Sequence, residues 1–484
     1  MWLPTGAIGR FQPNSSRITI ILLITTSAVF ATTGGYDSAL MTGINIMPSY
    51  TEFLKLTTAT RALNGIVSLT VGPVVNKIGR KNSILLSLFV KFLAVGLITD
   101  SQNVVIFLSS CIILGLAKGT SGIAGSTITF SVYYIGALIA AGVTYRTAEI
   151  DGEWSWRLPC LLQSIFAILS GLCLCFTPDS PRWLAHQDRP DDALRVLASI
   201  GADGDRSNPE VLEQYQQLID SRQKELDEGN TLSYSELIKT RTARRRVMLA
   251  LSVAVIAMGS GNNIASYFLG DMLTNAGITD KTTQLQINIV MNAWCLVCAM
   301  IGTFLMDKAG RKTLCLCACV GMTVLMFIIG GLTKKFSTSE QLSGIYGTVA
   351  SIFLFMGSYS VGITPATQLY PPEVLSYPMR GNGMAMWAGT IAVFAIGTTL
   401  VFPIALQAIS WRLYFIIGAW DLLETVFVAV FWVETKGKTL EEIDQLFEGV
   451  NYTDGVSATG EHEVVIHGKD DKLDTSSIAR SVKE

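Results

Sequence analysis

The chain has 484 residues, of which half are apolar and only 15% are charged, and its mean hydropathy is +0.42. Soluble domains carry roughly 25% charged residues, so this composition excludes a string of water-soluble domains. The net charge of −2 gives no reason to expect a nucleic-acid partner.

Apolar stretches close to the ~20 residues that cross a bilayer as a helix recur along the whole chain. They predict an all-α, multi-pass membrane protein whose immediate surroundings are lipid. The clearest stretches are Ile18–Phe30, Trp156–Phe176, Val247–Leu269, Thr313–Leu332, Ile345–Thr364, Gly383–Phe402 and Trp411–Trp432.

The alternation of apolar and polar segments divides the sequence into four parts. Residues 1–178 and 247–448 are predicted to be two transmembrane halves. Residues 179–246 contain eleven Lys and Arg and two amphipathic stretches, which predict a cytoplasmic loop with short surface helices. Residues 449–484 are polar and lack periodicity, which predicts a disordered cytoplasmic tail. Both termini are therefore expected in the cytoplasm.

A short charged turn occurs once in each half. Residues 76–81 read NKIGRK and residues 307–312 read DKAGRK. Glycine permits a tight reversal between two helices, and the cations can pair there with a carboxylate and with helix C-termini. Two copies at half-chain spacing predict two related halves, as in transporters built from parallel repeats.

Other chemistries find little support in the sequence. Cys295 and Cys298 form a CxxC pair, but they lie within an apolar run and lack the second ligand pair of a zinc site. Nucleotide-binding and hydrolase motifs do not occur. We therefore expect no metal, no other cofactor and no enzymatic activity.

Six motifs follow one another within residues 18–448. In combination they resemble the sugar porter family of the major facilitator superfamily, in the form common among fungal hexose and lactose permeases. They are GGYDSALMTG (34–43), the two Gly-Arg-Lys turns, PDSPRWL (178–184), SGNNIASYF (260–268), LYPPEVLSYPMRGNG (369–383) and VETKGKTLEEID (433–444).

The resemblance implies a major facilitator fold, in which two six-helix halves expose a central site to alternate sides of the membrane. It implies secondary transport of a hexose or disaccharide across the plasma membrane, coupled to a proton. We expect a monomer whose partners are a small sugar and the coupling proton. The alternatives are a transporter of a non-sugar metabolite, a sugar sensor that does not transport, and a degenerate, inactive porter.

The resemblance also implies a set of sugar-facing polar residues. Neutral amides and hydroxyls suit a polyol, whose hydroxyls both donate and accept hydrogen bonds, and they are costly in a membrane interior unless paired. Hydrogen bonds between helices of the bundle are the alternative role. The candidates are Ser260, Asn262, Asn263, Tyr267, Asn292, Thr364 and Gln368.

Asp37 is the candidate for proton coupling, because it is the one carboxylate expected within the first helix and proton-coupled relatives carry an acid there. A structural aspartate at the outer membrane boundary is the alternative. A second set of residues is expected to form a gating network of ion pairs at the cytoplasmic ends of the helices. This set comprises Gly79, Arg80, Asp307, Gly310, Arg311, Glu373, Arg380 and Glu434.

The N-terminal half departs from the family pattern. Asn76 replaces the aspartate of the Gly-Arg-Lys turn, and residues 115–142 contain no polar turn where two helices and a loop are expected. Only 14 residues separate Arg61 from Asn76, which is about 21 Å of helix. Helices two, four and five are therefore expected to be shortened, which could weaken the gate of this half or inactivate the porter.

Further departures affect the charges and the sugar site. Lys91 and Lys118 fall within apolar segments and are expected to be unpaired and to snorkel toward the membrane surface, although a substrate or counter-ion site is an alternative. The family's glutamines in helix seven are replaced by Ala257 and Met258, and its tryptophan in helix ten by Gln368. The identity of the substrate is thus open.

Overall fold

The computed structural model describes residues 15–50, 80–102, 106–107, 109–110, 129–179, 181–186, 189–227, 236–336, 341–438, 442–443 and 446–447. Within these ranges the regular structure is helical and contains no strand, which confirms the all-α prediction. Seven described helices are long and apolar enough to cross a membrane. Six of them overlap apolar stretches predicted from the sequence, and the seventh, Lys281–Ala309, lies outside that list.

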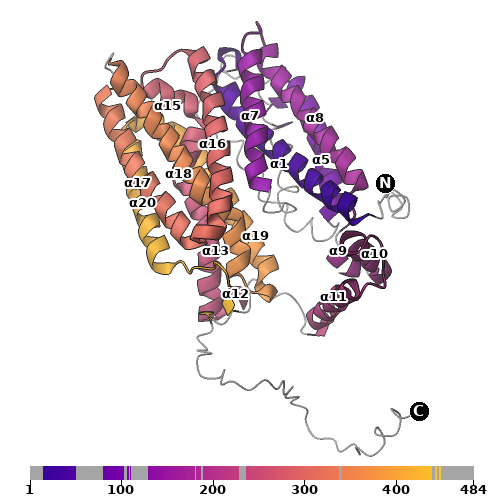
Figure 1. Ribbon diagram of the computed structural model, residues 1–484. Coiled ribbons are helices and arrows are strands. Elements are labelled where there is room, and N and C mark those ends of the chain that lie inside the picture. Colours follow the sequence, from indigo (N-terminus) through magenta and orange to yellow (C-terminus); the bar gives the residue numbers. More distant parts are fainter. Residues whose placement is uncertain are drawn as a thin grey trace, which may run out of the picture.

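The N-terminal half contains α1 (Ser16–Ile46), α5 (Arg80–Thr99), α7 (Thr129–Thr147) and α8 (Trp154–Phe176), which form one bundle (Figure 1). Tyr50, Phe107 and Trp156 pack edge to face in its core, with ring centroids 5.7–5.8 Å apart. The second and fourth helices, predicted to be shortened, fall largely outside the described residues. The fifth corresponds to α7, which has 19 residues, or about 28 Å of helix.

α1 and α7 pack against each other along much of their length. Two glycines make this contact close, because a Cβ atom on Gly35 would overlap the carbonyl oxygen of Tyr133, and one on Gly136 would overlap that of Thr32. Small residues allow helix backbones to approach in this way in membranes. Part of the GGYDSALMTG motif therefore has a packing role.

The C-terminal half begins with a broken helix. The stretch Val247–Leu269, predicted as one span, is divided into α13 (Arg241–Gly259), α14 (Asn262–Tyr267) and α15 (Leu269–Asn275). The break occurs at Gly261, whose φ of 78° is a left-handed conformation that a helix cannot continue through. The other helices of this half are α16 (Lys281–Ala309), α17 (Arg311–Phe336), α18 (Leu342–Val374), α19 (Tyr377–Ile409) and α20 (Arg412–Phe431).

Short helices occupy the interval between the halves, namely α9 (Pro181–His186), α10 (Pro190–Gly201), α11 (Pro209–Asp227) and α12 (Glu236–Lys239). α9, α10 and α11 share a small core around Leu184, Ala193 and Val196. This unit is attached to the start of α1, where the backbone and hydroxyl of Ser16 exchange two hydrogen bonds with Asp203. The beginning of α1 therefore lies at the end of the molecule that carries the short helices (Figure 1).

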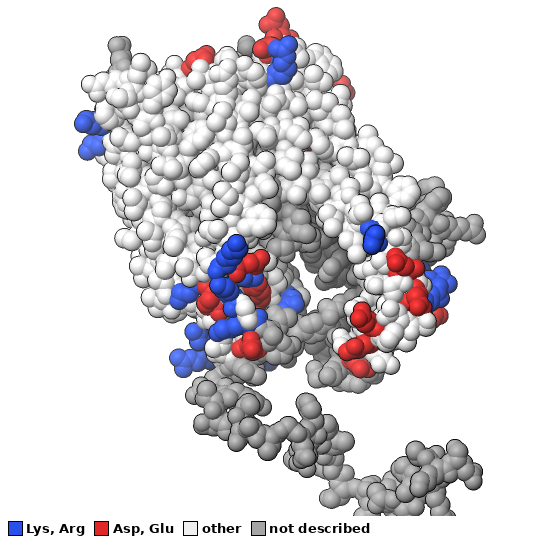
Figure 2. All heavy atoms as spheres, viewed as in Figure 1, with Lys and Arg blue, Asp and Glu red and all other residues white. Residues whose placement is uncertain are grey.

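Charged residues gather at the two ends of the molecule and leave a broad uncharged band between them (Figure 2). Exposed apolar side chains such as Phe89, Phe304 and Leu423 lie on α5, α16 and α20. Large apolar side chains that face outward over a whole belt indicate lipid contact. The distribution fits a bundle that crosses the bilayer several times.

The described residues of the two halves meet mainly through α7 with α16 and through α1 with α14, α15 and α16. Near the end of α1, Thr42 donates a hydrogen bond to the carbonyl oxygen of Ser266, and Asn45 donates one to that of Tyr267 (3.3 Å). Since α1 begins at the end that carries α9–α11, these bonds lie toward the opposite end. They join the two halves in the part of the bundle farther from α9–α11.

Candidate substrate cavity and gate

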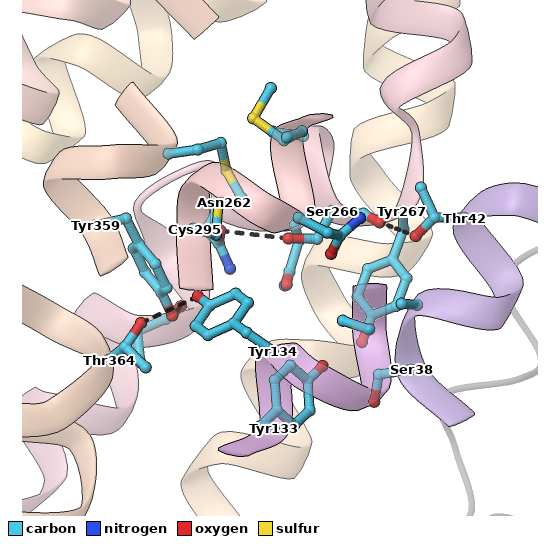
Figure 3. A pocket seen from close by; sticks show the side chains of 18 of the residues that line it. Ser38, Thr42, Tyr133, Tyr134, Asn262, Ser266, Tyr267, Cys295, Tyr359 and Thr364 are labelled. Carbon is cyan, nitrogen blue, oxygen red and sulfur yellow. Dashed lines mark hydrogen bonds between the residues drawn. The ribbon is translucent and has the colours of Figure 1, made fainter. Parts of the chain in front are cut away.

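A cavity of about 270 Å³ lies between the two halves. Its walls come from α1 and α7 on one side and from α13, α14, α16 and α18 on the other (Figure 3). Pockets for small molecules usually measure about 300–1,000 Å³, so this cavity suits a compact ligand. Five of the seven predicted substrate residues line it, namely Asn262, Asn263, Tyr267, Asn292 and Thr364.

The other two predicted substrate residues, Ser260 and Gln368, are not among the residues that line the cavity. Ser260 ends α13 just before the break and is fully buried. Gln368 lies in α18 next to Thr367, which does line the cavity. Consecutive residues of a helix point about 100° apart, so a residue next to a lining residue need not face the cavity itself.

Tyrosines from α7 line the cavity as well, although the sequence did not single them out. The hydroxyl of Tyr134 lies 3.0 Å from the Ser360 hydroxyl and 3.3 Å from the Thr364 hydroxyl, so it links the two halves (Figure 3). Tyr133 lies beside it and also borders the cavity. The sequence could have indicated them, because two tyrosines lie side by side in an otherwise apolar helix, and a buried tyrosine hydroxyl needs a hydrogen-bond partner.

Asn288 of α16 is the residue whose hydrogen bonding is least complete in this wall. It is 2% exposed and lines the cavity. Its carbonyl Oδ1 accepts a hydrogen bond from Asn292 (3.1 Å), whereas its Nδ2 has no partner among the described residues. A buried donor without a partner costs free energy, and a ligand oxygen would relieve that cost. Asn288 is thus a donor available to a bound molecule.

The wall is not uniformly polar. Ala257, Met258, Met291 and Met356 all line the cavity and give part of its wall an apolar surface. Asn263 is already engaged, because its amide donates to the hydroxyl of Thr398 in α19 (2.7 Å). One side of the cavity therefore offers hydrogen bonds and another offers flexible thioether contacts.

Asp37 lies inside α1, which continues to Ile46, so it does not end the helix at a membrane boundary. One carboxylate oxygen accepts a hydrogen bond from Lys91 (2.6 Å), and the other accepts one from Gln163 (2.9 Å). The side chains of Asp37 and Lys91 are only 8% and 7% exposed. The expectation that Lys91 is unpaired and snorkels is wrong, because α5 packs against α8 and directs its amine to α1. Lys118 lies outside the described residues.

The gating network predicted for the C-terminal half converges on Glu434. This carboxylate follows α20 and accepts hydrogen bonds from the backbone N–H groups of Arg311 (2.8 Å), Lys312 (3.1 Å) and Thr313 (3.4 Å). It thereby caps the N-terminus of α17, where a negative charge is stabilised by the helix dipole. Gly310 has a φ of 98° and leaves room for the carboxylate, since a Cβ atom there would overlap it.

Arg311 joins this cap to α18. Its guanidinium lies 3.1 Å from Glu373 and 3.3 Å from Asp307. Asp307 is largely exposed, so its pair with Arg311 contributes little. The Thr435 hydroxyl donates to the second oxygen of Glu373 (2.7 Å), which completes a link between the start of α17, the end of α18 and the segment after α20.

The remaining predicted gate residues are less well placed by the structure. Arg380 lies in the first turn of α19, near the end that carries this cluster. Arg80 begins α5, but its side chain is not described, and Gly79 lies outside the described residues. The counterpart of the gate in the N-terminal half is therefore still a prediction.

Replacing Glu434 by alanine should destabilise the protein by about 1–2 kcal/mol, because three N–H groups at the start of α17 lose their acceptor. The midpoint of thermal unfolding of the purified protein in detergent measures this loss. Glu149→Ala is a suitable control, since Glu149 pairs with Arg146 on an exposed surface and should contribute little. Equal midpoints for the two variants would contradict the capping role.

The family model described as sugar (and other) transporter matches residues 121–447. A high-affinity glucose transporter of Kluyveromyces lactis is 27% identical over 337 residues, which cover 65% of this chain and 59% of that protein. The match therefore spans less than two thirds of that relative's length. The major myo-inositol transporter IolT of Bacillus subtilis is 25% identical over 470 residues, which cover 91% of this chain and 96% of that protein.

Solved structures agree on the fold. The proton:xylose symporter XylE bound to 6-bromo-6-deoxy-D-glucose superposes with a TM-score of 0.72 at 18% identity, over 89% of this chain and all of that one. The likeness shows that the described helices have the major facilitator arrangement expected from the motifs. Because the family model covers more than half of the chain, this protein belongs to the sugar transporter family of the major facilitator superfamily, a family of transporters.

Proposed function

We propose that the protein carries a sugar across the membrane by alternating access, driven by a proton. The main support is the cavity between the halves, whose wall combines neutral amides and hydroxyls with an unpaired donor at Asn288. Such groups suit a hexose, which presents several hydroxyls and no charge. The names of the relatives, which include glucose, inositol and xylose transporters, support the same class of substrate.

The proton is proposed to act at Asp37. In the described state the carboxylate is held between Lys91 of α5 and Gln163 of α8, so it connects three helices of the N-terminal half. Protonation would remove the negative charge and weaken the ion pair. The free energy gained or lost at this buried pair can then bias the packing of α1 against α5 and α8. α1 also lines the cavity through Ser38 and Thr42, which connects the proton to the substrate.

The cluster around Arg311 and Glu434 is proposed as the gate of the C-terminal half. Its bonds join the ends of α17 and α18 to the segment after α20, at the end of the molecule near α12. Charge-assisted hydrogen bonds of this kind hold geometry well and can be made in one state and broken in another. We also propose that the protein lies in the plasma membrane as a monomer, with this end in the cytoplasm.

A non-sugar metabolite is the second candidate substrate. The replacement of two polar positions by Ala257 and Met258, together with Met291 and Met356, makes part of the cavity apolar. Thioether side chains adapt to irregular ligands. A partly apolar small molecule with several hydroxyls would use both sides of the wall.

Uptake of labelled glucose, galactose and lactose, in yeast cells that lack their own hexose carriers, tests the proposal. Expression at the plasma membrane is checked by fluorescence of a fused reporter. Saturable uptake that a protonophore abolishes supports proton-driven sugar transport, and uptake that ignores the protonophore supports a facilitator. Surface expression with no uptake of any of the three sugars would contradict the sugar assignment and favour the second candidate.

Within this proposal, Asn288→Ala should raise the KM for the transported sugar about tenfold, because one lost hydrogen bond in the cavity costs about 1.4 kcal/mol. The maximal rate at saturating sugar should change less. Ser358→Ala is the matched control, since that hydroxyl lies on the exposed side of α18 and bonds only within its own helix. An unchanged KM in Asn288→Ala would remove this residue from the binding site.

A further inference from the structure

α20 carries two buried carboxylates that the transport proposal does not use. Asp421 and Glu424 are one helical turn apart, and their residues are 1% and 6% exposed. Both oxygens of Asp421 and the Oε2 atom of Glu424 have no hydrogen-bond partner among the described residues. The other oxygen of Glu424 accepts a hydrogen bond from the indole N–H of Trp420 (2.6 Å). Neither residue belongs to any ion pair formed by the described part of the chain.

The helices packed against α20 supply no neutralising cation at this level. α17 contributes the thiol of Cys319 and the hydroxyl of Thr323, which lies 3.2 Å from Thr425 next to Glu424. Tyr359 of α18 also interacts with Glu424, but it is an uncharged phenol whose hydroxyl donates to the carbonyl of Ala257. The described part of α19 that contacts α20 carries no charged side chain, since Arg380 lies at the far, first turn of that helix.

The end of α13 also faces this part of α20. A Cβ atom on Gly259 would lie 2.9 Å from the indole nitrogen of Trp420 and 3.1 Å from Glu424 Oε1, so the backbone of α13 faces this turn of α20. The next residue, Ser260, is fully buried, and its hydroxyl also lacks a partner among the described residues. A second unsatisfied polar group therefore lies one residue after the glycine that faces Glu424.

A groove between α13 and α20 leads to Glu424. It has a volume of about 540 Å³, is almost entirely apolar, and is lined by Glu424, Trp420, Met248, Leu251 and Phe427. Arg244 lines it too, but on α13 this residue precedes Gly259, which faces Glu424, by 15 positions, or about 22 Å of helix. That arginine lies toward the cytoplasmic end and cannot form an ion pair with Glu424.

Two ionised carboxylates in this environment would be buried without compensation and would repel each other. We propose that Asp421 and Glu424 form a proton-binding site in the C-terminal half, separate from Asp37, in which the described conformation holds both as neutral acids. Glu424 borders the groove and is the group that exchanges its proton with water when α20 moves away from α13. Asp421 lies deeper and keeps its proton until that movement exposes it.

Infrared difference spectroscopy of the purified protein in lipid vesicles tests this site without relying on transport. At neutral pH the wild type should show the C=O stretching band of protonated carboxylic acids, and raising the pH should reduce it. The band should shrink in Asp421→Asn and in Glu424→Gln and shrink further in the double variant. Glu149→Gln, which removes an exposed carboxylate that pairs with Arg146, is the control and should leave the band unchanged.

Thermal unfolding provides a second test of whether Asp421 and Glu424 are neutral acids in the folded protein. Because ionising these groups inside the bundle costs stability, the unfolding midpoint of the wild type should fall as the pH rises from mildly acidic to mildly alkaline, and it should fall less in the double variant. The amide variants are close in shape to neutral acids, so each should purify as a folded protein. A band that is equal in wild type and double variant would overturn the proposal. The spectra are recorded with choline as the only cation in the buffer. Loss of the band when sodium replaces choline would also overturn the proposal, in favour of a metal-cation site.

Discussion

Alanine at position 35 should destabilise the protein by about 1–3 kcal/mol, because its methyl group would overlap the carbonyl oxygen of Tyr133 and push α1 away from α7. The same contact exists in reverse at Gly136, which faces the carbonyl of Thr32. Either substitution should lower the yield of folded protein and its unfolding midpoint in detergent. The loss concerns the wall of the cavity, since α1 and α7 both line it.

Gly34→Ala is the matched control for this prediction. It lies next to Gly35 in the same helix, and a Cβ atom there would meet nothing within 4 Å. Alanine favours helix over glycine by about 1 kcal/mol in soluble helices, so this variant should be as stable as the wild type or more so. Equal losses at positions 34 and 35 would mean that α1 and α7 are not in close contact at Gly35.

Asp37→Asn should abolish proton-driven accumulation of substrate, because the amide cannot bind and release the coupling proton. It should also lower stability, since Lys91 would be left as a buried charge without its partner, a change that typically costs about 3–5 kcal/mol. Accumulation in vesicles with an imposed pH gradient measures the first effect. The unfolding midpoint measures the second.

The double variant Asp37→Asn, Lys91→Met separates these two effects. Removing both charges should recover most of the stability lost in Asp37→Asn, because no unpaired ion remains. Proton-driven accumulation should remain absent, since the proton acceptor is still missing. Accumulation by either variant at the wild-type level would rule out Asp37 as the coupling residue.

The sequence predicted the class of fold well, because hydropathy, charge distribution and motif order all depend on local composition. It also grouped the polar turn at Gly310 with the carboxylate at Glu434, and in the structure Glu434 accepts a hydrogen bond from the backbone N–H of the residue after Gly310. The motif SGNNIASYF identified the broken helix seven as part of the site, and three of its residues, Asn262, Asn263 and Tyr267, line the cavity.

The features that were not predicted from the sequence depend on which helices pack against each other. Lys91 appears unpaired in the sequence, but α5 packs against α8 so that the amine of Lys91 reaches Asp37 in α1. Asp421 and Glu424 lie in an apolar stretch that predicts a simple membrane span, and only the packing of α13 and α17 shows that they are buried without cations. The role of Tyr134 in linking the two halves is likewise visible only from the packing of α18, which supplies the hydroxyls of Ser360 and Thr364.

The most direct test of alternating access through the central cavity is counterflow of labelled sugar in vesicles reconstituted with the purified protein. Vesicles loaded with unlabelled sugar and diluted into labelled sugar should accumulate the label transiently, without any proton gradient. Asn288→Ala should reduce this overshoot at low sugar concentration, and Ser358→Ala should not. The absence of an overshoot for glucose, galactose, xylose and myo-inositol, with correctly folded protein in the vesicles, would contradict sugar transport by this chain.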